Sequence, residues 1–421
     1  MSTVRRERRG DGVRKSKLCK KLLGVEHLVV EDGDIGVGPD GREMLVIRVR
    51  PDHRHRNRCS RCGRRCRYRD GGEGRRRWRG LDVGVMRCFV EAEAPRVTCP
   101  AHGVVVAAVP WARANSRFTT AFEEQAAWAC AAMAGTRAAQ LLGTTWRSLQ
   151  SIVERVVADL AGTCDRLDGL RRIGIDELSY RKGHRYIMVV VDHDTGRLVW
   201  AADGRCQDTV HAFFDVLGPE RTAQLAEVSA DGAEWLHDVV AERAPQARIC
   251  LDSYHVVAWA NEALAKVRRR LAVQLRGIAE LKDTRWAVIK DPANLTSRQR
   301  TTIAILGKLN SPLYRAYMIK EQLRDTFATG GDRGKTLLAG LVAWCARCRI
   351  PEFVALGRTL RRFRDLIGNT LDTGTTNGRV EATNTHLRAL TKRAYGFHSP
   401  QALIAMATLT RGGLCQALPR R

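Results

Sequence analysis

The sequence predicts a multidomain α/β protein in which a mixed α/β core is followed by a long helical segment. Its 421 residues suffice for two or three domains, each with its own core. Residues 170–262 alternate short apolar strands with helical stretches, which is typical of a mixed sheet. Residues 263 to about 368 have a helical pattern rich in Arg and Lys.

The composition indicates a folded protein that binds a polyanion. Hydrophobic residues make up 44% and charged residues 28%, as in soluble globular proteins rather than disordered ones. The 71 Lys and Arg against 45 Asp and Glu give a net charge of +26. This excess favours nucleic acid, with an affinity that falls as salt rises. A membrane surface is the competing polyanion, but no basic amphipathic helix flanks an apolar anchor.

Targeting and cysteine patterns predict a cytoplasmic protein. No apolar run of signal-peptide length follows the basic residues Met1 to Arg9, and stretches such as Val104 to Val109 are too short to span a bilayer. The 13 cysteines are odd in number and scattered. That pattern fits a reducing compartment with a few thiols recruited to metal, not a disulfide framework.

The N-terminal region is expected to be a basic, loose arm (1–20) followed by a β module. Strands are predicted in 27–30 and 44–49, with a turn at Gly38-Pro39-Asp40-Gly41 between them. Residues 51–80 hold 12 Arg and only 3 acidic residues. We expect this surface to contact phosphates rather than to be a merely solvated basic face. Tyr68 and Trp78 are candidates for base stacking there.

Two pairs of potential metal ligands have zinc-site spacing. The ligands are Cys59, Cys62, Cys99 and His102. In each pair two residues separate the ligands, and a following Gly permits a tight turn. Cys3His coordination predicts a closed, structural zinc site. Cys66 and Cys88 are spare thiols that would replace one ligand, whereas Cys345 and Cys348 lack a second pair nearby and are expected to be core or surface thiols.

Residues 136–153 have the pattern of a helix-turn-helix. Gly143 marks the turn, and Thr145 is a suitable N-cap for the second helix. The buried side of this helix would carry Leu149, Ile152 and Val153. The residues expected to be exposed and available to DNA are Arg137, Trp146, Arg147, Ser148, Gln150 and Ser151. An ordinary helical hairpin is the alternative, and the basic context favours DNA binding.

The α/β core is predicted to contain five strands, in 172–175, 186–191, 198–202, 225–229 and 248–251, with helices in 209–217 and 233–242.

Three acidic residues are placed to share a metal site in this core. Asp176 and Asp231 each follow an apolar strand, and Glu381 begins a helix whose polar face includes Asn384 and Arg388. Carboxylates gathered in this way hold Mg²⁺ or Mn²⁺, and two such ions promote displacement at phosphorus. The neighbouring acids expected to be solvated turn residues are Glu177, Asp192, Asp203 and Asp208; for Glu177 and Asp192 the alternative is a position close to the site.

Asp252 is the main rival of Asp231 as the second carboxylate. It opens Asp252-Ser253-Tyr254-His255 directly after the fifth strand, so its side chain also faces the carboxyl end of the sheet. His255 either orients the metal site or contacts DNA; the alternative is that it packs under the following helix.

These motifs resemble those of DDE insertion-sequence transposases of the ISL-three family, over nearly the whole chain. The segments that carry the resemblance are the two zinc-ligand pairs, the helix-turn-helix, Gly174-Ile175-Asp176-Glu177, Asp252–Val257 and Asn377–Asn384. The resemblance implies an RNase H-like catalytic core that a helical insertion splits before the Glu-bearing helix. His102 departs from the family pattern, in which a fourth Cys is often expected, although His replaces Cys chemically.

The resemblance further implies an enzyme that binds the terminal inverted repeats of its own element and catalyses Mg-dependent cleavage and transfer of double-stranded DNA. A homodimer or larger assembly in the nucleoid of a bacterial cytoplasm is expected. The alternatives are a DNA-binding regulator without catalysis and an RNase H-type nuclease. The expected domains are the arm (1–20), the zinc-binding β module (21–112), the helix-turn-helix domain (113–165), the first part of the core (166–262), the helical insertion (263–370), and the Glu-bearing helix with the C-terminus (371–421).

Overall fold

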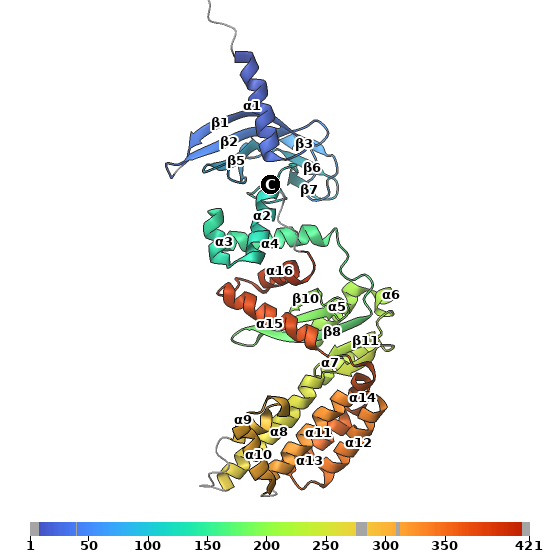
Figure 1. The fold of residues 1–421 in the computed structure, drawn as a ribbon. Coiled ribbons are helices and arrows are strands. Elements are labelled where there is room, and N and C mark those ends of the chain that lie inside the picture. Colours follow the sequence, from blue (N-terminus) through green and yellow to red (C-terminus); the bar gives the residue numbers. More distant parts are fainter. Residues whose placement is uncertain (1–7, 39, 275–283, 309–311, 415–421) are drawn as a thin grey trace, which may run out of the picture. The chain divides into compact units, whose positions relative to one another are not determined.

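The computed structural model describes residues 8–38, 40–274, 284–308 and 312–414. The chain divides into two compact units, residues 1–163 with 414–421 and residues 164–413 (Figure 1). In the described residues no helix is long and apolar enough to cross a membrane.

The first unit begins with helix α1 (Arg8–Leu23), so the expectation of a loose arm is wrong for residues 8–20. The last turns of α1 pack on the β module because Cys19 and Leu23 join its hydrophobic core. Cys19 is buried, and its sulfur lies close to Gly33 of strand β1. Residues 1–7 of the predicted arm lie outside the described residues.

Two sheets form the β module. The first has the order β1-β2-β5-β4, from β1 (Leu28–Val37), β2 (Glu43–Pro51), β5 (Arg87–Glu93) and β4 (Arg75–Arg79). The second has the order β3-β6-β7, from β3 (Arg67–Asp70), β6 (Arg96–Cys99) and β7 (Gly103–Val106). The predicted turn joins β1 and β2, where the Gly41 N–H donates to the Gly38 carbonyl at 3.0 Å. Pro39 lies outside the described residues.

Three helices complete the first unit: α2 (Thr120–Ala132), α3 (Gly135–Leu142) and α4 (Trp146–Ala161). The turn between α3 and α4 requires a left-handed backbone, which Gly143 supplies with φ of 58°. Thr145 is the N-cap of α4, as predicted, and its hydroxyl accepts the Ser148 N–H at 3.2 Å.

The second unit is built on one five-stranded sheet of order β10-β9-β8-β11-β12. The strands are β8 (Arg172–Arg181), β9 (Arg185–Asp192), β10 (Leu198–Asp203), β11 (Glu227–Ala230) and β12 (Arg248–Leu251), so all five predicted strands are present. Strand β9 pairs antiparallel with both β8 and β10, whereas β11 pairs parallel with both β8 and β12.

Helices cover both faces of this sheet (Figure 1). On one face, α5 (Gln207–Leu217) and α7 (Glu234–Arg243) form a hydrophobic core with the strands, and the short α6 (Pro219–Thr222) follows α5. On the other face lie α15 (Gly378–Arg393), which contacts β8 and β9, and α16 (Pro400–Arg411), which contacts β10. The last two helices therefore return the end of the chain to the sheet.

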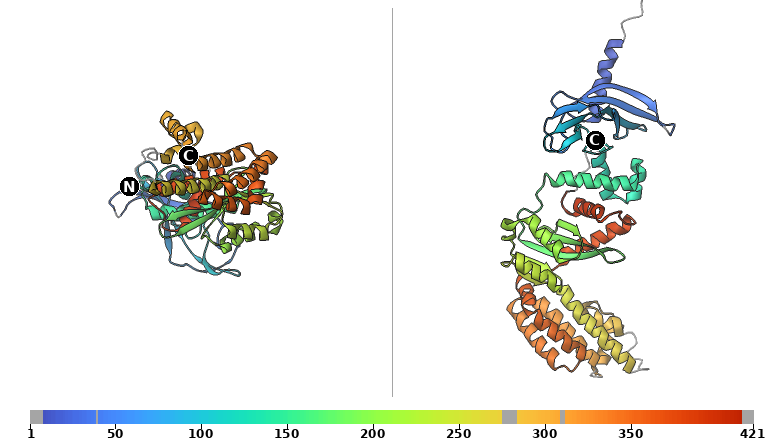
Figure 2. Two further views of the ribbon diagram at one scale, coloured as in Figure 1. Left: turned by 90° about the horizontal axis from the view of Figure 1, so that it is seen from below. Right: turned by 180° about the vertical axis from the view of Figure 1, so that it is seen from behind.

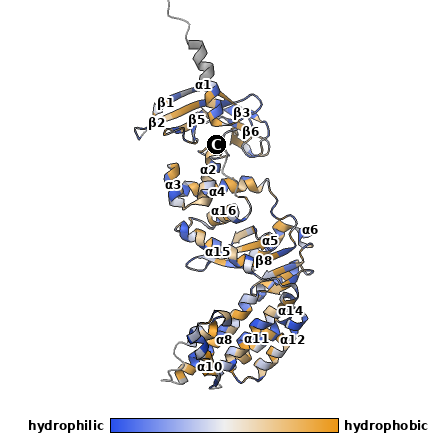
Figure 3. Ribbon diagram, in the orientation of Figure 1, coloured by the Kyte–Doolittle hydropathy of each residue, from blue (hydrophilic) through white to orange (hydrophobic). Residues whose placement is uncertain are grey.

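Between β12 and α15 the described chain is helical. The helices are α8 (Ser253–Gln274), α9 (Thr284–Ile289), α10 (Ser297–Lys308), α11 (Pro312–Thr329), α12 (Gly331–Arg347), α13 (Pro351–Arg362) and α14 (Arg364–Thr373), which pack side by side (Figure 2). Apolar and polar residues alternate along α8, α11 and α12 (Figure 3), as expected of helices with one buried face. Cys345 and Cys348 are both buried in the core of these helices, so of the two expected positions, core and surface, they occupy the core.

Candidate catalytic site and nucleic-acid-binding modules

The two predicted ligand pairs meet at one point of the β module. The Sγ atoms of Cys59, Cys62 and Cys99 and the ring of His102 offer ligand atoms that all lie within 4.8 Å of one another. The Cys62 and Cys99 sulfurs are 3.8 Å apart, and the His102 Nδ1 lies 3.6 Å from the sulfurs of Cys59 and Cys99. Tetrahedral zinc with bonds of about 2.3 Å to sulfur and about 2.0 Å to nitrogen gives edges of about 3.8 and 3.6 Å. The cluster therefore has the dimensions of a structural zinc site.

The thiol chemistry of the cluster also suits zinc, which binds thiolates. Burial raises the pKa of Cys99, but the N–H groups of Ala101 and His102 outweigh it, and the pKa lies at about 7. The spare thiols do not join the four ligands. The Cys66 thiol donates to the Arg64 carbonyl at 3.3 Å, and Cys88 is buried in the core of the first sheet.

A second group of ligand-type side chains, His27, Asp52 and His55, lies at the start of the β module. Both imidazole Nδ1 atoms face the Asp52 carboxylate, at 3.3 and 2.9 Å. The two rings are stacked at 3.9 Å with an angle of 19° between their planes. One ion cannot lie in two nearly parallel ring planes, so hydrogen bonding to Asp52 explains this group.

The second helix of the helix-turn-helix differs from expectation on one side. Its predicted buried side is correct, because Leu149, Ile152 and Val153 are all at most 1% exposed. Gln150 was expected to face DNA, and this is wrong: its side chain is only 2% exposed. Trp146 is half-buried because it packs on α3, where a Cβ at Gly135 would lie 2.4 Å from the indole ring.

The remaining candidates for DNA contact keep accessible side chains. Arg137 and Arg147 are exposed, and Ser148 and Ser151 are partly exposed. In the Arg-rich part of the β module Tyr68 is 53% exposed. Trp78, by contrast, cannot stack on a base, because it is buried and packs edge-on against Trp111 at 5.6 Å.

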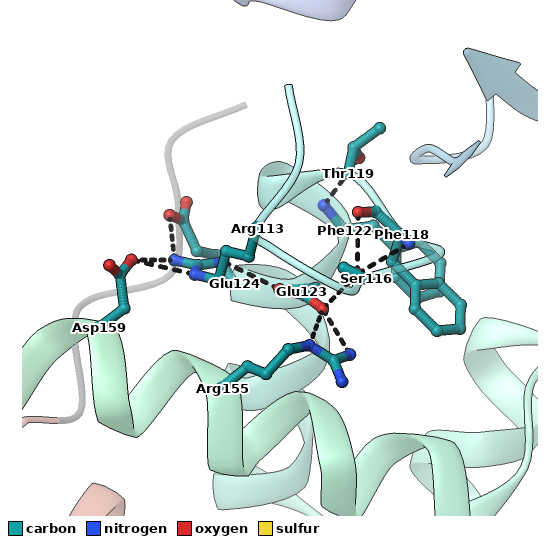
Figure 4. Close-up of polar contacts among 9 residues, drawn as sticks. All are labelled: Arg113, Ser116, Phe118, Thr119, Phe122, Glu123, Glu124, Arg155 and Asp159. Atoms are coloured by element: carbon teal, nitrogen blue, oxygen red, sulfur yellow. Dashed lines mark hydrogen bonds and ion pairs between the residues drawn. The ribbon is translucent and has the colours of Figure 1, made fainter. Parts of the chain in front are cut away.

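A buried carboxylate ties α2, α4 and the segment before α2 together (Figure 4). Glu123 on α2 is fully buried and receives two hydrogen bonds from Arg155 of α4, at 2.8 and 2.6 Å. Ser116 donates to it at 2.7 Å and Arg113 at 3.2 Å. Arg113 also reaches Asp159 of α4 at 3.0 Å. This network fixes the helix that carries the candidate DNA-binding residues.

In the second unit, three aspartates stand at one level of the sheet. The register pairs Ser229 of β11 with Gly174 of β8 and with Cys250 of β12. Two residues further on, Asp176 lies within β8, and Asp231 and Asp252 directly follow β11 and β12 at the same level. Asp176 and Asp252 both reach the face that α15 covers, because Asn384 and the Asn377 N–H of that helix bind them. Asp231 lies near enough for its charge to act on Asp176. We call these three residues the aspartate rung.

Helix α15 docks on β8 directly below the rung. Gly174 permits this approach, since a Cβ there would lie 2.3 Å from Val380 Cγ2. One turn along the helix, the Asn384 amide donates to Asp176 Oδ2 at 2.7 Å. Asn384 is 3% exposed, and its Oδ1 has no hydrogen-bond partner in the described part of the chain. An unpaired buried oxygen beside a carboxylate is a candidate ligand atom.

Asp252 and Asp231 differ in how fully their oxygens are used. Asp252 is 2% exposed, binds the His255 Nδ1 at 2.8 Å and accepts the Tyr254 and Asn377 N–H groups at 3.3 and 3.4 Å. Asp231 is half-buried, and the side-chain hydrogen bond recorded for it is from the Ala233 N–H, at 3.0 Å. His255 thus does more than pack under a helix: it holds Asp252.

Glu381 is on the helix face that meets the rung, but its side chain is exposed. Asn377 and Asn384, which contact Asp252 and Asp176, are four residues before it and three after it. This spacing places Glu381 between them on one face of α15. Among the described residues, neither Glu381 nor the three aspartates of the rung belong to a group of ligand atoms that all lie within 4.8 Å of one another. Arg388 is also exposed, one turn beyond Asn384.

The electrostatics of the rung are unfavourable without a cation. Burial first, and then the negative charges of Asp231 and Asp252, raise the pKa of Asp176 to about 6. The pKa of Glu177 is also raised by burial, although Arg205 forms an ion pair with it. The hydrogen bond to Asp252 raises the pKa of His255 and favours the imidazolium.

Of the acids expected to be solvated, Asp203 and Asp208 are exposed, whereas Asp192 is only 4% exposed because it caps the turn after β9.

Several residues that shape these sites were not singled out from the sequence. They are Gly174, His193, Ser229 and Asn377 around α15, and Arg113, Glu123 and Arg155 in the helix-turn-helix. Asn377 lies in a segment that the sequence analysis quoted, but a single asparagine before a helix is usually a simple cap. An acidic residue in the Ala-rich α2 is the only signal that marks Glu123, because its partners are distant in the chain.

Comparison with known proteins finds three family models in order along the chain. They are described as a zinc finger of transposases IS204/IS1001/IS1096/IS1165, matching residues 55–102, a helix-turn-helix domain of transposase family ISL3, matching 107–157, and a transposase, matching 173–407. Transposases for insertion sequence element IS1557 from two strains of Mycobacterium tuberculosis are 46% identical over 436 residues, covering 97% of this chain and 98% of the relative. The transposase for IS1001 from Bordetella parapertussis is 25% identical over 358 residues, covering 82% and 86%.

Replacing one zinc ligand is expected to unfold the β module. Cys99→Ala should lower the bound zinc from one per chain to nearly none, because structural zinc contributes about 10 kcal/mol or more to such folds. Zinc is measured with a chromogenic chelator after denaturation, and β structure by circular dichroism. Cys66→Ala is the matched control and should keep its zinc; equal zinc loss in both variants would contradict the ligand set.

Removing the buried charge of Glu123 should destabilise the first unit strongly. In Glu123→Gln the buried Arg155 pair loses its anion, while Arg113 keeps Asp159 and Glu124; breaking such a pair costs about 3–5 kcal/mol. The neighbouring Glu124 is 36% exposed and contacts Arg113 at 3.3 Å, so Glu124→Gln should cost less than about 1 kcal/mol. Urea unfolding of the two variants measures the difference, and equal midpoints would show that the network is not the anchor.

Without added divalent cation, ionisation of Asp176 should weaken the second unit as the pH rises. The pKa of Asp176 is about 6 in the fold, above the ordinary 3.8. The protonated side chain therefore contributes fully to the free energy of unfolding below about pH 4. This contribution, about 3 kcal/mol, is lost as the pH rises through about 6. Thermal unfolding between pH 4.5 and 7.5 should show this fall in the wild type. Asp176→Asn cannot ionise there and should show a smaller fall; identical pH profiles would refute this assignment.

Proposed function

Because the chain belongs to the ISL3 family of transposases, with zinc-ribbon and DNA-binding helix-turn-helix modules before the transposase region, we propose that it cleaves and transfers DNA strands at the ends of its own insertion sequence. The observation that carries this proposal is the aspartate rung with α15 docked against it. The zinc and helix-turn-helix modules would bind the terminal inverted repeats, and the second unit would perform the chemistry.

The strand order supports an RNase H-like core. Three antiparallel strands, β10, β9 and β8, continue into the parallel β11 and β12, with helices on both faces. The helices from α8 to α14 then form the insertion that separates this sheet from α15. The sheet alone does not define an activity, since one fold carries many functions. The carboxylates at the carboxyl ends of β11 and β12 and within β8 are what make it a candidate nuclease core.

The donor set suits hard divalent cations. Asp176, Asp231 and Glu381 would hold Mg²⁺ or Mn²⁺ through oxygen atoms, and the unpaired Asn384 Oδ1 adds a neutral oxygen. The pKa of Asp176 is raised mainly by burial and in addition by the charges of Asp231 and Asp252, and a bound cation would offset both. When bound, such ions supply Lewis-acid activation of the attacking oxygen and stabilisation of the leaving oxygen at phosphorus.

The surrounding side chains would position these groups. Asn384 holds one oxygen of Asp176, and His255 holds Asp252. We assign Asp231 rather than Asp252 as the second catalytic carboxylate, because Asp252 is already engaged by three donors at the base of α15. The exposed Arg388 would neutralise a phosphate of the bound DNA end.

The same site would serve two successive steps. In the first, a water oxygen attacks the phosphodiester at the element end, its P–O3′ bond breaks and the 3′-hydroxyl leaves. In the second, that 3′-hydroxyl attacks a phosphodiester of target DNA, whose own P–O3′ bond breaks and releases the 3′-hydroxyl of the target strand. Two ends must be held together, so a homodimer or larger assembly on double-stranded DNA is proposed. Contacts to the inverted repeats would come from Arg137, Arg147 and Ser148, with Trp146 shaping the helix that presents them. A regulator without catalysis is the alternative, and the intact carboxylates argue against it.

Isosteric variants of the carboxylates test the assignment. Asp176→Asn, Asp231→Asn and Glu381→Gln should each lower the rate of Mg-dependent cleavage of labelled element-end DNA by at least about 10³-fold. Binding of the same DNA should stay within about twofold, because the zinc and helix-turn-helix modules are unchanged. Asp203→Asn, at the exposed last residue of β10, is the matched control and should cleave normally.

Asp252→Asn separates the two candidates for the second carboxylate. It keeps an oxygen for the N–H groups but weakens the bond to His255, so a loss of about 10–100-fold is expected. Full loss in Asp252→Asn with activity retained in Asp231→Asn would reverse their roles. Cleavage by Asp176→Asn and Glu381→Gln at the wild-type rate would overturn the site altogether.

A further inference from the structure

A chain of three buried polar side chains runs beneath α15. His193 directly follows β9, Ser229 lies in β11, and Asn377 is the N-cap residue of α15. They are 7%, 0% and 1% exposed. The His193 Nε2 lies 2.6 Å from the Ser229 Oγ, and the Ser229 hydroxyl donates to the Asn377 Oδ1. The chain thus joins three elements that are far apart in the sequence.

The direction of these hydrogen bonds fixes the Asn377 amide. Ser229 has one hydroxyl hydrogen, and since it goes to Asn377, the Ser229 oxygen accepts from the His193 Nε2–H. Burial, with the cations of Arg172 and Arg379, lowers the pKa of His193 and keeps the ring neutral. The Asn377 Oδ1 is therefore held toward Ser229, and its NH₂ group points away from that bond.

These hydrogen bonds do not explain the NH₂ group of Asn377. The Asn377 Nδ2 is buried and has no hydrogen-bond partner in residues that the structure describes. The backbone N–H of the same residue donates to Asp252 Oδ1 at 3.4 Å, so Asn377 borders the aspartate rung. A buried donor left free beside carboxylates is costly unless it has a partner when the site is in use.

The hydrogen-bonded side chains of His193, Ser229 and Asn377 also fix the start of α15, the helix that carries Glu381. The Glu381 N–H donates to the Asn377 carbonyl at 2.8 Å, so these residues form the first turn of α15. Gly174 lies beneath this turn, and a Cβ there would lie 2.8 Å from the His193 Nε2 as well as against Val380. Helix, histidine and strand therefore meet at one point without room for adjustment.

We propose that His193, Ser229 and Asn377 are positioning residues of the catalytic site: they hold the first turn of α15 in register with the aspartate rung and present the Asn377 NH₂ group to the Glu381 carboxylate of the loaded site. This inference rests on the proposed strand-cleavage function. None of the three residues is assigned a contact with the reacting atoms through its fixed hydrogen bonds; they act through the placement of Glu381.

A matched control, Thr375, lies two residues before Asn377 in the sequence. The Thr375 hydroxyl donates to Glu227, so it too ties the segment before α15 to β11 through a buried side chain. This bond joins the lower end of β11, four residues before Asp231. Thr375→Val therefore removes a comparable buried hydrogen bond while leaving Asn377 and the aspartate rung intact.

The experiment measures single-turnover cleavage of a labelled element-end duplex at saturating Mg²⁺, together with binding of the same duplex and thermal stability. Ser229→Ala and Asn377→Ala should lower the cleavage rate about 10–100-fold, as for other residues that orient a metal site, with binding within about twofold of the wild type. Thr375→Val should lose similar thermal stability but cleave within about twofold of the wild-type rate.

His193 provides a rescue test. Gln places an amide donor near the position of the imidazole Nε2, so His193→Gln should cleave within about threefold of the wild type, whereas His193→Leu should behave like Ser229→Ala. If His193→Leu does not fold, the Gln and Ser229→Ala variants still decide. Wild-type cleavage by Ser229→Ala and Asn377→Ala would overturn the positioning role alone. A wild-type protein that binds ends without cleaving them would remove the proposed function and this inference with it.

Discussion

The close approach of α15 to β8 at Gly174 is the contact on which the second unit depends. With no side chain on Gly174, Val380 sits directly on the strand, and the residues on either side of it reach the sheet. Asn384 then meets Asp176, and Asn377 meets Ser229 and Asp252. A segment some 200 residues later in the chain thus completes a site begun by β8. Any side chain at position 174 would push the helix away and separate these groups.

The same contact explains why some of the site was predictable from sequence and some was not. Asp176, Asp231 and Asp252 follow or lie in short apolar runs, and the parallel register of β8, β11 and β12 carries them to one level. Such patterns are local and can be read along the chain. The chain of His193, Ser229 and Asn377 is different, because each member looks like an ordinary turn, strand or cap residue. Only the packing of three distant elements makes them neighbours.

The first unit shows the same division between local and distant information. Ligand spacing predicts the zinc cluster, and the turn glycine with the Thr145 cap predicts α3 and α4. Exposure of single side chains is set by what packs on them: Gln150 faces the interior, Trp146 lies on Gly135, and Trp78 meets Trp111. The buried Glu123 shows that part of the large excess of Lys and Arg stabilises the fold itself. Arg113 and Arg155 pair with this carboxylate and not with DNA phosphates.

The charge around the aspartate rung supports the metal proposal from another direction. In a protein with 71 Lys and Arg residues, the recorded partners of Asp176, Asp231 and Asp252 are an asparagine amide, backbone N–H groups and one histidine. Burial and the charges of Asp231 and Asp252 raise the pKa of Asp176, and in the described part of the chain no Lys or Arg hydrogen bond or ion pair to these three aspartates offsets them. A structural cluster of three acids would be expected to recruit arginine, as Glu123 does with Arg155. The retained negative charge, on a face closed by two buried asparagines with unpaired polar atoms, is better explained as a site kept for an external cation.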